Sequence, residues 1–282
     1  MGIGCVIITP LFSGTYDDLK MRKTIVLLLI FLFSLTGSFV PSSAAEFIGK
    51  FPTGLLQLEK KHAYYLFIPQ DYSPEKSWPI VFLIGKRGED PKEVIEPWVE
   101  WAKRNQFLIA APPNLTPEKD VPASADEWLL DLKKEIAERY KIDPLKTFVI
   151  GLDAGAHYAA YLGTRYPGQF SAAALIHEAW SGPYEKLIKP SSDRKRQISF
   201  YVSMDPKEEK FSKVEKRALE FENKGYRITF EPLKSGEDLS ALRDRLSQWF
   251  QEDADARSVL TKRPRKTMKE KVNGFFSDFF EV

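Results

Sequence analysis

Short apolar runs alternate with amphipathic segments through most of the chain, and no other feature of the sequence constrains the fold as strongly. The run 79–85 is continuously apolar, and 147–151 is a short, mostly apolar run; both are typical of strands that are buried on both faces. The segment 126–141 instead places its apolar side chains at helical spacing. Strands that alternate with helices in this way predict a mostly parallel sheet with helices on both faces, an α/β fold.

The predicted elements follow one another without an internal repeat. The expected strands are 62–69, 79–85, 107–112, 147–151, 172–177, 198–203 and 226–232. The expected helices are 92–105, 126–141, 154–165, 208–224 and 238–250. Ligands of such sheets bind at the carboxyl ends of the strands, so the residues that follow each strand are the candidates for a site.

Composition excludes several classes of protein. The 282 residues include 41 Lys and Arg against 39 Asp and Glu, a balance that argues against a nucleic-acid partner. The single cysteine, Cys5, excludes an internal disulfide and a cysteine-based metal cluster. Nothing in the sequence indicates a metal or an organic cofactor, so we expect none.

The amino-terminal 45 residues have the pattern of an export signal. The basic residues Arg22 and Lys23 precede an apolar run at 24–40 and then small residues up to Ala45. This order is typical of a cleaved secretory signal peptide, and the run is short for a membrane-spanning helix, which needs about 20 residues. We therefore expect an exported, periplasmic or extracellular protein; a retained signal anchor is the alternative.

The carboxyl-terminal segment differs from the body of the chain. Residues 257–271 contain seven Lys or Arg and one acid, and a phenylalanine stripe at helical spacing follows them. Such a segment could bind an anionic membrane surface, dock on a partner protein or cover the edge of the sheet. The expected organisation is an extension with a signal peptide at 1–45, a domain at 46–253 and a basic tail at 254–282.

One motif carries the functional argument. The pentapeptide GLDAG at 151–155 lies between an expected strand and an expected helix. The pattern G-x-S-x-G at such a junction is the nucleophile elbow of α/β hydrolases, but here Asp153 replaces the serine. Around it, the sequence YKIDPLKTFVIGLDAGAHYAAYLGTRYPGQFSAAA resembles secreted esterases related to polyhydroxybutyrate depolymerases and feruloyl esterases. The resemblance extends over roughly residues 62–250.

The resemblance implies an α/β-hydrolase fold, a small ester-like ligand and a serine–aspartate–histidine triad. The nucleophile position falls on Asp153 and the acid position on Asp205. The histidine position falls near Glu237, and no histidine occurs anywhere from 178 to 282. The oxyanion and pocket positions fall on Ala154 and on the loop that contains Gly85, Lys86 and Arg87, where the family often has His-Gly-Gly.

Three interpretations of Asp153 follow. Asp153 could be a nucleophile with His177 as its base, oriented by Glu178 or Asp205, because carboxylates do act as nucleophiles. His177 could instead be a histidine hydrogen-bonded within the strand-end packing. Asp153 could also pair with Lys86 or Arg87 and fill the oxyanion hole with a salt bridge.

The sequence therefore favours a degenerate hydrolase. A serine nucleophile needs a neighbouring base, and the sequence lacks both at the expected positions. We expect a weak or inactive carboxylic-ester hydrolase that keeps a ligand pocket. Trp180, which follows His177, could contact a ligand at the edge of that pocket or pack in the core, and we favour packing. The alternatives are an active hydrolase with Asp153 as nucleophile, and a non-catalytic protein that binds a partner or a membrane surface.

Overall fold

The computed structural model describes residues 52–117, 121–180, 182–233 and 239–262. All of these residues belong to a single unit, which spans Phe51–Val282. The expected signal peptide, Glu237 and most of the basic tail lie outside the described residues.

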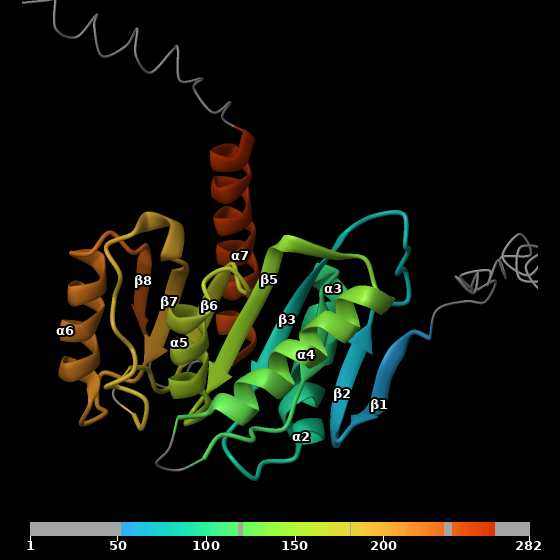
Figure 1. Ribbon diagram of the computed structural model, residues 1–282, viewed down its shortest axis with the longest axis horizontal. Coiled ribbons are helices and arrows are strands. Elements are labelled where there is room, and N and C mark those ends of the chain that lie inside the picture. Colours follow the sequence, from blue (N-terminus) through green and yellow to red (C-terminus); the bar gives the residue numbers. More distant parts are fainter. Residues whose placement is uncertain (1–51, 118–120, 181, 234–238, 263–282) are drawn as a thin grey trace, which may run out of the picture. The chain divides into compact units, whose positions relative to one another are not determined.

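A single sheet forms the centre of the described part of the chain (Figure 1). Its strands are β1 (Gly54–Lys60), β2 (His62–Ile68), β3 (Trp78–Ile84), β4 (Leu108–Ala111), β5 (Ile142–Leu152), β6 (Ala172–Ile176), β7 (Ser199–Met204) and β8 (Ile228–Pro232). They lie in the order β1-β2-β4-β3-β5-β6-β7-β8. β2 pairs antiparallel with β1 and with β4, and all pairs from β4 to β8 are parallel.

Helices cover both faces of this sheet, as the alternating pattern predicts (Figure 1). One face carries α4 (Ala123–Arg139), α5 (Gly155–Arg165) and α6 (Phe211–Glu222). The other face carries α2 (Pro91–Ile95), the 3-10 turn η1 (Glu96–Trp98), α3 (Val99–Asn105) and α7 (Leu239–Lys262). A second 3-10 turn, η2 (Arg194–Arg196), precedes β7.

The two cores divide the side chains of each central strand with a period of two. In β3, Ile80, Phe82 and Ile84 pack beneath α4 and α5. Val81 and Leu83, which alternate with them, pack against the other helices. Side chains of successive strand residues point to opposite faces, so a continuously apolar strand supplies both cores at once.

The structure corrects the expected helix at 92–105. Asp90 caps its beginning through a bond from the Lys92 N–H to the Asp90 Oδ1 (2.9 Å). The segment then divides into α2, η1 and α3, because Pro97 has no N–H to donate and its ring disfavours a continuous α-helix. The predicted spacing was right, but the helix is not continuous.

Two further elements depart from the prediction. The antiparallel edge strand β1 was not predicted, because its side chains are only half-buried and do not form a strong apolar run. The last helix, expected at 238–250, continues to Lys262. Beyond residue 250, Ala254 packs in the core, and the buried carboxylate of Asp253 binds Ser199 and Arg257. No helix of the described residues is both long and apolar enough to cross a bilayer.

Candidate active site

The elbow predicted at 151–155 is present at the carboxyl end of β5. Asp153 has a left-handed backbone, with φ of 48°, and α5 begins two residues later. A side chain on Gly155 would overlap the carbonyl oxygens of Ile84 and Gly85, and one on Gly151 would overlap the backbone of Ala156. Only glycine fits these two positions, which is why the strand can turn so sharply into the helix.

His177 faces Asp153 from the end of the neighbouring strand. Its Nδ1 lies 2.9 Å from the Asp153 Oδ1 and donates a hydrogen bond to it. Backbone bonds hold both residues: the Asp153 N–H donates to the Ile176 carbonyl (3.0 Å), and the His177 N–H to the Ser203 carbonyl (2.8 Å). The His177 side chain is 41% exposed and that of Asp153 49% exposed. The dyad is therefore accessible to water and to ligands.

The contact raises the pKa of the histidine and lowers that of the acid. The hydrogen bond to Asp153 is the largest cause of the raised His177 pKa, while burial opposes it. The hydrogen bond from His177 lowers the Asp153 pKa most strongly; burial again opposes, and the charges of His177 and Lys86 add to the lowering. Both shifts favour an imidazolium–carboxylate pair.

The sequence suggested a salt bridge between Asp153 and Lys86 or Arg87, and the structure shows an ion pair of Asp153 with His177. The Asp153 carboxylate is paired with His177, and Lys86 lowers its pKa through charge alone. The structure thus places His177 next to Asp153, as the sequence hypothesis required. A role for either residue in catalysis stays a prediction.

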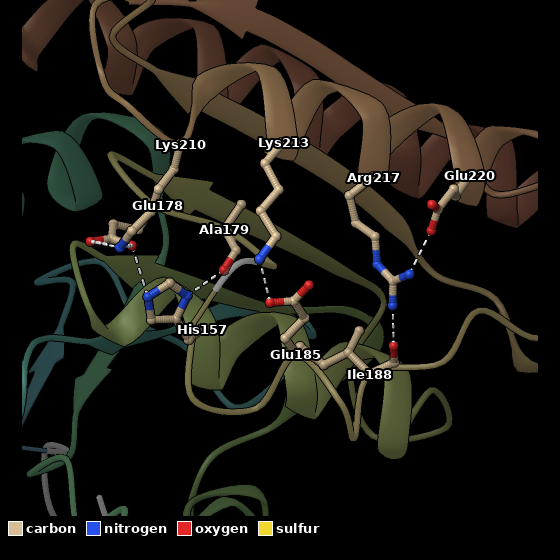
Figure 2. Close-up of polar contacts among 9 residues, drawn as sticks. All are labelled: His157, Glu178, Ala179, Glu185, Ile188, Lys210, Lys213, Arg217 and Glu220. Atoms are coloured by element: carbon tan, nitrogen blue, oxygen red, sulfur yellow. Dashed lines mark hydrogen bonds and ion pairs between the residues drawn. The ribbon is translucent and has the colours of Figure 1, made fainter.

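The residues proposed to orient His177 have other partners. Glu178 Oε2 lies 2.8 Å from the Nε2 of His157 and 3.2 Å from the Nζ of Lys210 (Figure 2). The Asp205 Oδ1 accepts a bond from the Lys207 N–H at 2.9 Å, within a local turn. Among the described contacts, neither acid meets His177, so an orienting role for either one stays a prediction.

His157 has the packing role that the sequence suggests. It is 4% exposed, and its Nδ1 bonds the Ala179 carbonyl (Figure 2). Its Nε2 meets Glu178, so both ring nitrogens face acceptors. His157 therefore ties α5 to the segment that follows β6.

The side chain of Glu89 closes the loop after β3, in which the sequence resemblance places the oxyanion residues Gly85, Lys86 and Arg87. The backbone N–H of Lys86 donates to the Glu89 Oε2 at 2.9 Å, and the Glu89 N–H donates to the Lys86 carbonyl at 3.2 Å. The Gly85 carbonyl accepts a bond from the Asn114 Nδ2 at 2.8 Å. A carboxylate thus already accepts the N–H of Lys86, one of the residues that the resemblance assigns to the oxyanion loop.

A cavity of about 170 Å³ opens beside the dyad. Its walls come from the ends of β5 and β6, from α2 and η1, and from α7. Apolar side chains form much of it, and Glu89, Glu93 and Arg243 bring charge to it. The Arg243 guanidinium lies over the Trp98 ring, 5.1 Å from its centroid. The cavity is large enough for a small organic ligand and places it against Asp153 and His177.

Comparison of this structure with solved structures identifies the fold. A fluorophosphonate-binding serine hydrolase, FphF, from Staphylococcus aureus matches with a TM-score of 0.57 and 9% identity, over 72% of this chain and 99% of that chain. A ferulic acid esterase matches with a TM-score of 0.58 and 15% identity, over 73% and 99%. The enzyme MGS-M1, from a Medee basin deep-sea metagenome library, matches with a TM-score of 0.57 and 19% identity, over 72% and 98%.

The chain has the α/β-hydrolase fold. The fold implied by the sequence resemblance is thereby confirmed. No protein-family model matches the sequence, and no curated protein does. At these identities the likeness is one of fold, and the chemistry must be argued from the residues of this chain.

The α/β-hydrolase fold brings together only some of the predicted site residues. Asp153, Ala154 and His177 lie at the carboxyl edge of the sheet, next to the loop of Gly85, Lys86 and Arg87. Trp180 is 1% exposed, stacks on Phe221 and is not among the residues that line the Asp153 cavity. Within the described residues, no group of three or more potential metal ligands occurs.

Sequence reasoning missed two residues of the site. Glu89 is three residues beyond Lys86 in a short loop, a spacing that could have suggested a turn closed by its side chain. Arg243 comes from α7, far along the chain, and no local signal connects it with the elbow. Its place in the cavity depends on how α7 packs on the sheet.

Proposed function

We propose that the protein is a hydrolase-fold protein of esterase ancestry with a degenerate triad, weak or inactive toward carboxylic esters, which keeps a small-molecule pocket. The observation that carries this proposal is the Asp153–His177 pair at the nucleophile elbow. A serine esterase needs a hydroxyl there, with a histidine to take its proton. Here the elbow side chain is itself an acceptor of the histidine proton.

The oxyanion loop supports the same proposal. Stabilisation of the developing oxyanion needs free donors that point at the reacting oxygen, and their loss costs about 10²–10³-fold in rate. The Glu89 carboxylate accepts the Lys86 N–H. If this loop is the oxyanion loop, as the resemblance implies, the carboxylate occupies a donor of that loop and adds negative charge beside it. Under this proposal, both the nucleophile position at Asp153 and the oxyanion loop differ from those of a serine esterase.

A second candidate, an active hydrolase, rests on the same 2.9 Å contact. The free Asp153 oxygen would attack the acyl carbon of an ester and expel its alkoxide or phenolate, which forms a mixed anhydride between the acyl group and Asp153. The His177 Nε2, which no described residue bonds, would take a proton from water, the resulting hydroxide would cleave that anhydride, and the imidazolium would give the proton to the departed alkoxide or phenolate. This route needs a neutral imidazole, whereas the pair favours the charged form.

Turnover of short- and medium-chain aryl esters separates the two candidates. The purified chain is compared with Asp153→Asn, with His177→Gln and with Asp131→Asn, a control on the exposed side of α4. The degenerate hydrolase predicts equal turnover for all four proteins. The Asp153 route predicts that turnover falls at least about 10³-fold in Asp153→Asn and in His177→Gln and stays unchanged in Asp131→Asn.

Export is proposed from residues 21–45 of the sequence. A basic start, an apolar run and small residues before Glu46 support a cleaved signal peptide. Expression of the whole chain in a secreting host, followed by amino-terminal sequencing, should give a protein that begins at Glu46. Recovery of the uncleaved chain from the membrane fraction would favour the retained anchor instead.

A further inference from the structure

The imidazole of His157 makes a second contact between the two segments that carry the dyad. His157 lies in the first turn of α5, four residues after Asp153, and is 4% exposed. Its ring faces Glu178 and Ala179, which directly follow His177 at the end of β6 (Figure 2). The elbow and its helix are therefore joined twice to the same turn, once by the Asp153–His177 pair and once by His157.

Both nitrogens of the His157 ring lie against oxygens that accept hydrogen bonds. The Nε2 is 2.8 Å from the Glu178 Oε2, and the Nδ1 bonds the Ala179 carbonyl. A neutral imidazole has only one N–H, so it could donate to just one of these oxygens and would turn a lone pair to the other. A ring that carries both protons satisfies both contacts.

The state of Glu178 distinguishes two sources of the second proton. A protonated Glu178 could donate to a neutral ring, but its Oε2 also lies 3.2 Å from the Lys210 Nζ (Figure 2). An ammonium at this distance stabilises the carboxylate form of the acid. The contacts therefore favour an imidazolium at His157 that donates to both oxygens.

The backbone of the turn also packs directly on this ring. A side chain on Gly182 would overlap the atoms of the His157 ring, so the turn can approach the ring only because a glycine stands there. Ala179 is fully buried next to it. The ring thus fixes the turn by packing as well as by hydrogen bonds.

His177 depends on support from both sides because its backbone conformation is unfavourable. Its φ is 67°, and a residue other than glycine keeps such a conformation only where its surroundings enforce it. Before it lies the ladder of β6, and its own N–H donates to the Ser203 carbonyl at 2.8 Å. After it, Glu178 and Ala179 are both bound by His157.

We propose that His157, as an imidazolium, is a positioning residue for the dyad and holds the turn after β6 so that His177 meets Asp153. Glu178 acts through His157 and helps to orient His177 without touching it. The proposal rests on the Asp153–His177 pair that carries the proposed function, and it applies to both candidate functions. Ester turnover tests those candidates, whereas the geometry of the pair is followed by NMR without any substrate.

The protons on the His157 ring provide one test. In NMR spectra of the whole chain at neutral pH, the ¹⁵N shifts correlated with the ring C–H protons show whether each nitrogen carries a proton. The His157 signals are those that disappear in His157→Gln. We expect both nitrogens to be protonated, and an unprotonated nitrogen in the wild type would overturn the imidazolium.

The titration of His177 provides the test of positioning. The hydrogen bond to Asp153 is the largest cause of its raised pKa, so this pKa reports whether the two side chains meet. Glu178→Ala removes the acceptor of the His157 Nε2, and the His177 pKa should then fall toward its ordinary value of 6.5. Glu178→Gln keeps an oxygen that can accept from this nitrogen and should retain more of the raised pKa.

Two control variants separate positioning from a general loss of stability. Lys210→Gln removes the other partner of Glu178, and His177 should titrate in it as in the wild type. Tyr161→Phe removes a buried hydrogen bond between α5 and α4, away from the turn. It should lower the stability of the chain in denaturant without changing the His177 pKa.

Two outcomes of the titration would contradict the positioning role. An unchanged His177 pKa in Glu178→Ala would show that the dyad forms without this contact and that His157 only packs. Equal falls of the His177 pKa in Glu178→Ala and in Tyr161→Phe would show that any loosening of α5 separates the dyad.

Discussion

At the scale of single residues, the aspartate at the tip of the elbow fits the backbone of the turn and determines which side chain it binds. Asp153 keeps a left-handed φ of 48°, a conformation in which aspartate is tolerated better than most residues. The carboxylate then accepts the proton of His177, which itself has a φ of 67°. Two strained residues therefore stabilise each other through one charged hydrogen bond.

The first prediction concerns the titration of His177. In Asp153→Asn the carboxylate that raises the His177 pKa is lost, so this pKa should fall toward its ordinary value. The measurement is an NMR titration of the imidazole signals, which is practical because the chain has only three histidines. Asp131→Asn should leave the titration unchanged, and an unaltered His177 pKa in Asp153→Asn would show that the pair does not form.

The second prediction concerns the pH dependence of stability. The raised His177 pKa gives stability that is complete below its unfolded value of 6.5 and is lost as the pH rises through the folded value. The lowered Asp153 pKa gives stability above 3.8 that is lost as the pH falls through the folded value. The pair therefore stabilises most between these two unfolded values.

Denaturant unfolding of the wild type and of Asp153→Asn measures this dependence. The wild type should be more stable at pH 5, by less than about 1 kcal/mol because both side chains are partly exposed, and the difference should shrink at pH 9. A difference that grows toward alkaline pH would contradict the sign of the His177 shift.

At the scale of elements, the elbow depends on close contact between β3, β5 and α5. The α5 amino terminus approaches the end of β3 so closely that only the absent side chain of Gly155 permits it. The helix carries no side-chain cap there, so its position comes from this packing and from the buried face of α5.

The third prediction tests this contact. Gly155→Ala places a methyl group on the carbonyl oxygens of Ile84 and Gly85 and should lower the free energy of unfolding by about 3 kcal/mol. Gly168→Ala is the matched control, because a methyl group there meets nothing within 4 Å, and its effect should be near zero. Equal stability of the two variants in denaturant titrations would contradict the tight elbow.

At the scale of the whole molecule, a buried carboxylate joins the helices on one face of the sheet. Asp126, in the first turn of α4, is 2% exposed. Its Oδ1 accepts the hydroxyl of Tyr158 at 2.8 Å, and its Oδ2 accepts those of Tyr161 (2.9 Å) and Tyr166 (2.8 Å). This network ties α4 to α5 and to the turn that follows α5.

The fourth prediction follows from this network. Asp126→Ala leaves three tyrosine hydroxyls without their acceptor and should lower the free energy of unfolding by about 3 kcal/mol. Asp131→Ala, an exposed acid on the same helix, should change it by less than about 0.5 kcal/mol. Equilibrium unfolding of both variants is the measurement, and a small effect of Asp126→Ala would mean that water replaces the carboxylate.

Much of the fold could be predicted from local patterns, because an element that is buried on one or two faces has apolar residues at a regular spacing in the sequence. The strands of the parallel part and the helices α4 to α7 were expected near their observed positions. The edge strand β1 left no such trace, because its side chains are only half-buried. The burial of Asp126 could not be predicted from the amphipathic helix that contains it, because its hydrogen-bond partners are tyrosines more than 30 residues away.

The sequence by itself determined the strand–helix alternation and the glycine-flanked turn with an acid at its tip, because both depend on residues that are neighbours in the chain. Only the tertiary structure decided the partner of that acid. The parallel register pairs Leu152 of β5 with Ile176 of β6, so the next residues, Asp153 and His177, emerge side by side at the edge of the sheet. Such a register depends on the packing of both cores and leaves no signal near either residue.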